Sequence, residues 1–95
     1  MNLKPFLVKL QEICRENDIA LLGVFGSVAR GEDSSHSDVD LLIRLRQPIG
    51  LIRLIQLEDK FADILDRKVD LTTQTSLHPL VQSDVMRDLK ILYEA

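Results

Sequence analysis

The sequence contains few residues of several types, and each shortage excludes a class of protein. A single cysteine, Cys14, excludes an internal disulfide and makes a reducing cytosol the expected compartment. With no tryptophan, three phenylalanines and one tyrosine, the chain has too few aromatic rings for a base-stacking platform. No apolar run reaches the length of a membrane-spanning helix, and the first residues lack the pattern of a signal peptide. We therefore expect no membrane partner.

The charge balance argues against direct binding of nucleic acid. The 95 residues include 12 basic and 15 acidic side chains, which gives a formal net charge of −3. Proteins that hold bare nucleic acid need clustered cations instead. Phosphates that arrive together with Mg²⁺ are still compatible with this balance. At 45% hydrophobic residues the chain has the composition of an ordinary globular protein, and its length predicts a single domain over residues 1–95.

Hydrophobic periodicity predicts alternating helices and strands. Helices are expected over 5–16, 51–65 and 77–88, and strands over 19–25, 38–45 and 68–73. The residues just after Gly26 are compatible with a short helix. Residues 89–93 are compatible with a strand or with a continued helix, and we favour a strand. This order predicts an α/β (α+β) domain with a mixed three- or four-stranded sheet.

Three acidic residues are candidate metal ligands. Asp38 and Asp40 begin the expected second strand two positions apart, so their carboxylates point to one face. Asp70 is the acidic residue within the third strand, and it faces the same site if that strand pairs with the second. Carboxylate oxygens suit Mg²⁺ or Mn²⁺, and three of them can hold the two ions used in nucleotidyl transfer. Each acid considered alone is equally compatible with a solvated residue at a turn or strand surface.

Gly26 and Ser27 follow an apolar strand, where a phosphate can bind. Glycine permits close approach of the backbone, and a helix start offers free N–H groups. The alternative is a tight turn with Ser27 as a helix cap. Arg30 can reach the same phosphates, or it can pair with Glu32 or Asp33 on the surface.

Other residues invite structural explanations. We expect Cys14 to be a core residue, His36 a solvated loop residue, and His78 a cap or a surface residue near the start of the helix over 77–88, with Pro79 near its first turn. The apolar stripe of residues 51–65 is expected to serve the core, with a partner interface as the alternative.

The segments GSVARG and SDVDLLI, with VDL further along, together resemble the signature of the DNA polymerase beta-like nucleotidyltransferase superfamily. At this length the chain is similar to the minimal nucleotidyltransferases of the MntA type. The resemblance implies a small mixed sheet with helices mainly on one side. It also implies that Gly26 and Ser27 bind an NTP, and that Asp38 and Asp40 bind Mg²⁺. Asp70 would be a ligand of a second metal ion or the base.

The resemblance further implies a partner. Proteins of this type act as antitoxins in a type VII-like pair, transferring AMP from ATP to a tyrosine of a HEPN-domain toxin (HepT-like). Two alternatives stay open: an antitoxin that inhibits by docking alone, and a nucleotidyltransferase that acts on a small molecule such as an antibiotic. The acceptor site is expected to be shallow or supplied by another chain, in a homo- or hetero-oligomer.

Overall fold

The computed structural model describes residues 1–95 and contains one mixed sheet. Its strands are β1 (Ile19–Phe25), β2 (Val39–Leu45), β3 (Val69–Thr73) and β4 (Lys90–Glu94), in the spatial order β3-β2-β1-β4. The helices are α1 (Leu7–Glu16), α2 (Gly26–Arg30), α3 (Leu51–Leu65) and α4 (Pro79–Asp88). Short 3-10 turns occupy Lys4–Phe6 and Gln74–Ser76. The expected fold class is confirmed, and the chain ends in a strand.

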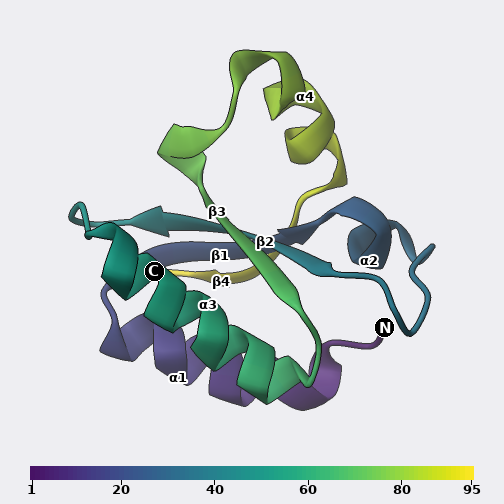
Figure 1. Cartoon of the computed structure of the whole chain (residues 1–95), viewed down its shortest axis with the longest axis horizontal. Coiled ribbons are helices and arrows are strands. Elements are labelled where there is room, and N and C mark those ends of the chain that lie inside the picture. Colours follow the sequence, from purple (N-terminus) through teal and green to yellow (C-terminus); the bar gives the residue numbers. More distant parts are fainter.

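The strand directions follow from the connections. β1 is antiparallel to both β2 and β4, whereas β2 and β3 are parallel and are joined through α3. A parallel pair needs a crossover of this kind, because a tight turn reverses the chain. Figure 1 shows α1 and α3 on one side of the sheet and α4 on the other side. The helices therefore cover mainly one face.

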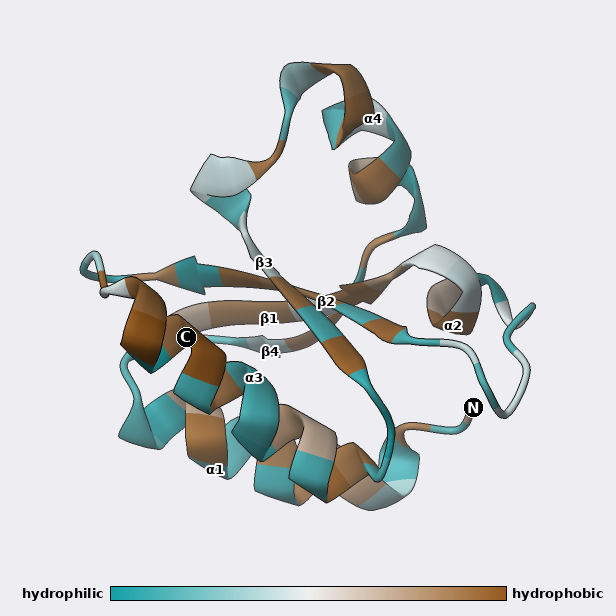
Figure 2. Ribbon diagram, in the orientation of Figure 1, coloured by the Kyte–Doolittle hydropathy of each residue, from teal (hydrophilic) through white to brown (hydrophobic).

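The core lies between the sheet and the α1–α3 layer. Figure 2 shows hydrophobic β1 and β2 at the centre and alternating hydrophilic and hydrophobic bands on α1 and α3. The fully buried side chains in this cluster include Leu10, Cys14, Leu22, Leu41, Ile43, Leu57 and Phe61. Cys14 is the core residue that the sequence predicted, and burial raises the pKa of its thiol to about 12. Such a thiol is inert at neutral pH.

The apolar stripe of α3 divides between core and surface. Leu57 and Phe61 are buried against the sheet, as expected, whereas Ile52 and Ile55 near the start of the helix are exposed. The core covers only part of the apolar stripe of α3, so all four side chains would be buried only if a second surface covered the outer part of the helix. None of the four helices combines the length and the apolarity that crossing a bilayer requires.

The start of α4 confirms the expected role of His78. Its imidazole Nδ1 accepts a hydrogen bond from the Leu80 backbone N–H at 3.1 Å, and Pro79 occupies the first helical position. The missing N–H of proline would be unpaired there in any case. His78 is thus a helix cap.

Replacing Phe61 with alanine should lower the free energy of unfolding by about 3–5 kcal/mol, because the ring is fully buried and its removal leaves a cavity. Ile52→Ala on the same helix is the matched control. Its side chain is 75% exposed, so the change should stay within about 0.5 kcal/mol. Urea denaturation measures both variants. Similar losses in the two would contradict the assigned core face of α3.

Candidate active site

The parallel pairing of β2 with β3 brings two acids together. Asp40 lies opposite Asp70 in the register of these strands. Asp38 precedes β2 by one residue and shares the face of Asp40, since side chains alternate along a strand. The prediction that the third strand pairs beside the second is confirmed. Asp38 and Asp70 are exposed, and Asp40 is half-buried.

The three carboxylates are close enough to influence one another. Burial raises the pKa of Asp40, and the negative charges of Asp70 and Asp38 raise it further. The positive charge of Arg30 acts in the opposite direction, as the smallest of the four causes. Negative charge therefore accumulates here beyond what the neighbouring cation offsets. A bound cation would relieve that repulsion.

Gly26 lies directly against Asp40. It joins β1 to α2 with a φ of +73°, a conformation that L side chains rarely adopt. A Cβ at this position would overlap Oδ2 of Asp40. The preceding residue, Phe25, pairs with Asp40 across the β1–β2 ladder, which fixes this close approach. Glycine is thus required here by both conformation and space.

Ser27 follows Gly26 on α2 and is half-buried. The short helix expected after Gly26 is present, but it has only five residues. A macrodipole grows with the number of aligned peptides, so that of α2 is small. An anion at this position would be attracted mainly by the backbone N–H groups at the start of the helix. Ser27 is placed beside the acids, through its neighbour Gly26.

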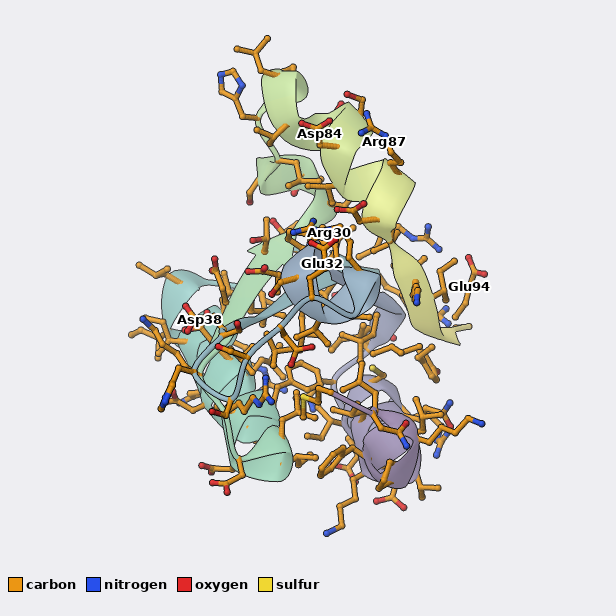
Figure 3. The ribbon with its side chains drawn as sticks, turned by 90° about the vertical axis from the view of Figure 1, so that its right-hand side faces the viewer. Arg30, Glu32, Asp38, Asp84, Arg87 and Glu94 are labelled. Atoms are coloured by element: carbon orange, nitrogen blue, oxygen red, sulfur yellow. The ribbon has the colours of Figure 1, made fainter.

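Arg30, at the end of α2, is engaged by two acids. Its Nη1 lies 2.6 Å from Oδ2 of Asp88, and its Nε lies 3.1 Å from Oε2 of Glu32. These hydrogen bonds raise the pKa of the Arg30 guanidinium. Figure 3 shows Arg30 and Glu32 together below α4, with Asp38 further along the loop. Glu32 was an expected partner and Asp88, from α4, was not. A contact of Arg30 with phosphate stays a prediction.

Asp33 is a residue that sequence reasoning assigned only as a possible partner of Arg30. Its carboxylate instead accepts hydrogen bonds from the Met1 ammonium and from Nη1 of Arg67, both at 2.9 Å. These two cations lower the pKa of Asp33. The stabilisation is present above the ordinary pKa of the group and is lost as pH falls through the lowered value. No local sequence pattern signals a pairing across 34 positions.

The acids have the donor chemistry for a divalent ion. Side-chain oxygens are the ligands that Mg²⁺ prefers. Burial raises the pKa of Asp40 most, and the charges of Asp70 and Asp38 add to it. In this structure no three His, Cys, Asp or Glu side chains lie close enough together to hold a metal ion. Oδ2 of Asp38 lies 3.8 Å from Nζ of Lys68, a surface lysine. By their chemistry the three carboxylates suit Mg²⁺.

Comparison with known proteins connects this geometry to a family. The family model described as "Polymerase beta, Nucleotidyltransferase" matches residues 8–95. The chain belongs to this nucleotidyltransferase family. It is 37% identical to the protein adenylyltransferase MntA of Thermococcus cleftensis over 72% of the chain and 69% of that relative. The resemblance inferred from Gly26–Ser27 and the three acids is confirmed at the level of the family.

Two solved structures share the fold. A crystal structure of a toxin–antitoxin with AMP-PNP matches with a TM-score of 0.82 and 26% identity, over 94% of this chain and 73% of that one. The second structure is described as a tri-AMPylated HEPN toxin of Shewanella oneidensis in complex with MNT antitoxin. One chain of it matches with a TM-score of 0.77, over 99% of this chain and 74% of that one. At 23% identity the second likeness shows the fold alone.

Gly26→Ala should cost about 1–3 kcal/mol of stability and weaken ATP binding, because the methyl group meets both a positive φ and Asp40. Gly31→Ala is the matched control, since Gly31 has the same φ of +73° but no neighbouring atom within 4 Å of an added Cβ. Chemical denaturation and ATP titration measure the two variants. Equal effects of both would show that Asp40 does not constrain Gly26.

Asp40→Asn should stabilise the metal-free protein at pH 7. The raised pKa means that the charged carboxylate opposes folding, so stability falls as pH rises through that pKa. Removing the charge should raise Tm, by only a small amount because solvent screens a partly exposed carboxylate. The gain should vanish below the ordinary pKa. Melting curves in the presence of chelator measure the change in Tm, with the exposed Asp59→Asn as control. A lower Tm of Asp40→Asn at pH 7 would contradict the repulsion.

Proposed function

We propose that this chain transfers AMP from ATP to a tyrosine hydroxyl of a HEPN-type toxin and thereby acts as its antitoxin. The observation that supports this most strongly is the alignment of Asp40 with Asp70, with Gly26 directly beside Asp40. Family membership supports nucleotidyl transfer. The relative from Thermococcus cleftensis is named for protein adenylyl transfer, which supports a protein acceptor.

Each residue has a proposed role. Gly26 and Ser27 hold the triphosphate through backbone N–H groups and the serine hydroxyl, and Arg30 supports them after exchanging an acidic partner for phosphate. Asp38 and Asp40 hold Mg²⁺, or Mn²⁺. Bound there, the ion would supply positive charge that stabilises the α-phosphate and the departing pyrophosphate. Asp70 either holds a second ion or receives the proton of the attacking hydroxyl.

The reaction conserves atoms in one displacement. The tyrosine oxygen forms a bond to the α-phosphorus of ATP, and the bond from that phosphorus to the β-phosphate oxygen breaks. Pyrophosphate leaves, and the hydroxyl proton passes to a base, for which Asp70 is the candidate. Asp40 faces Asp70 across the β2–β3 pair, so the candidate base and one of the metal ligands lie on paired strands, whereas Asp38 lies just before β2.

The partner is proposed to be a HEPN-domain toxin, with the chain working as one catalytic unit over residues 1–95 in the cytosol. The solved structure at 26% identity is a toxin–antitoxin with AMP-PNP, which supports a toxin as acceptor. The single cysteine is free and buried, which is compatible with a reducing compartment. ATP is the proposed nucleotide because that solved structure contains AMP-PNP.

A docking-only antitoxin is the alternative from a different class. Docking alone does not require two acids to face each other beside Gly26, whereas this chain sets Asp40 opposite Asp70 in the β2–β3 register. Features that oppose stability persist mainly where function uses them. A small-molecule acceptor is the third possibility, and no pocket is lined by the three acids.

The Asp38→Asn/Asp40→Asn double variant should transfer no AMP, while its fold stays intact because both side chains keep their shape. Intact mass spectrometry of a HEPN-domain protein co-expressed with this chain, after incubation with ATP and Mg²⁺, measures the transfer. Wild type should add one or more AMP units, and chelator should prevent it. A double variant that still modifies the toxin would exclude the metal mechanism. Toxin silenced without any mass gain would establish inhibition by docking.

A further inference from the structure

Two chain segments deliver the candidate metal ligands to the sheet. The loop after α2 leads to Asp38 and β2, and the turn after α3 leads through Arg67 and Lys68 to β3 and Asp70. Because β2 and β3 are parallel, both segments enter the sheet at the same end. The distance between Asp38 and Asp70 therefore depends on how these two segments are held together.

Arg67 joins the two segments directly. Its Nη1 donates to Oδ2 of Asp33 at 2.9 Å and to the backbone carbonyl of Ser34 at 3.1 Å. The side chain of Asp33 is 4% exposed and that of Arg67 is 19% exposed. The other pairs between side chains have at least one member that is more than 40% exposed. Shielding from water makes this pair the one least weakened by solvent.

A chain of hydrogen bonds continues from Ser34 to the first metal-ligand candidate. The Ser37 backbone N–H donates to the Ser34 carbonyl at 3.1 Å, and the Ser34 N–H donates to Oγ of Ser37 at 2.9 Å. Asp38 is the next residue. Beyond it, the Val39 N–H donates to the Lys68 carbonyl at 2.9 Å, which closes the path back to the turn that holds Arg67.

We propose that Asp33 and Arg67 are positioning residues that hold Asp38 in place beside the Asp40–Asp70 pair for divalent-metal binding. The expected effect on AMP transfer rests on the proposed function. The expected effect on the position of Asp38 is tested separately, by Mn²⁺ binding. Neither residue touches the reacting atoms. They act through Ser34 and Ser37, which carry the restraint to Asp38.

The electrostatics of the site explain why such a restraint is needed. Asp38 and Asp40 are like charges two positions apart on one face of β2, so without a restraint on the loop they would be driven apart. The contact of Asp38 with Lys68 does not prevent this, since it spans 3.8 Å and Lys68 is 81% exposed. The Asp33–Arg67 pair is therefore the shielded contact that opposes the repulsion before metal binds.

The test uses Mn²⁺ as the probe, with affinity measured by electron paramagnetic resonance and AMP transfer measured alongside. Asp33→Asn and Arg67→Met should weaken Mn²⁺ binding about 10–100-fold, the usual loss when a residue supporting a metal ligand is removed. They should raise the Mg²⁺ requirement of AMP transfer by a similar factor. Arg67→Lys should recover part of the affinity, because an ammonium restores the charge but not both hydrogen bonds.

Two controls separate positioning from general stability. Asp18→Asn removes the exposed Asp18–Arg46 pair at the opposite end of the sheet and should leave Mn²⁺ affinity unchanged. Ile13→Val, a core change of about 0.5–1.5 kcal/mol, tests whether destabilisation alone lowers metal affinity. If Asp33→Asn does not fold, Arg67→Met carries the test, since Asp33 then keeps its contact with the Met1 ammonium.

Wild-type Mn²⁺ affinity in both Asp33→Asn and Arg67→Met would overturn the proposal, as would an equal loss in Ile13→Val. A wild-type protein that binds Mn²⁺ but transfers no AMP would refute the proposed function while leaving the positioning test intact. A wild-type protein that binds no Mn²⁺ would overturn both.

Discussion

The pairing of β2 with β3 is the interaction on which the rest of the site depends. Parallel pairing in this register sets Asp40 opposite Asp70. α3 makes the crossover possible, and its buried residues hold both strands on the core. The fold therefore uses its hydrophobic core to hold like charges close together. That arrangement opposes stability and is useful only when a cation joins it.

Backbone conformation and ion pairing adapt the surroundings to this charge. Gly26 accepts a left-handed conformation and leaves space for the Asp40 carboxylate, which any side chain would take. Arg30, at the end of α2, partly offsets the negative charge of the acids, and Asp88 of α4 holds Arg30 in turn. The Asp33–Arg67 pair secures the loop that carries Asp38. Each of these groups lies around the acids, while Cys14 and Phe61 serve only the core.

Local patterns were sufficient to predict the elements. Periodicity predicted three strands and three helices, because each hydrophobic stripe matches the face that packs on the core, and it left the short helix after Gly26 and the last strand open. Spacing marked the acids and Gly26–Ser27 as candidates, and the resemblance to the nucleotidyltransferase superfamily gave them their expected roles. The partners of Arg30 and Asp33 were less accessible, since Asp88 and Arg67 lie 58 and 34 positions away and only the tertiary fold brings them near. The exposed start of α3, with Ile52 and Ile55, also escaped prediction, because periodicity does not reveal how wide a stripe the core covers.

We propose that Asp38 and Asp40 hold a divalent metal ion beside the Gly26–Ser27 turn, opposite Asp70. The decisive measurement is a crystal structure of the chain with a non-hydrolysable ATP analogue and Mn²⁺, located by anomalous scattering. We expect Mn²⁺ between the Asp38 and Asp40 carboxylates, with the triphosphate against Gly26 and Ser27. Mn²⁺ bound away from both acids, or a triphosphate held elsewhere on the chain, would contradict it.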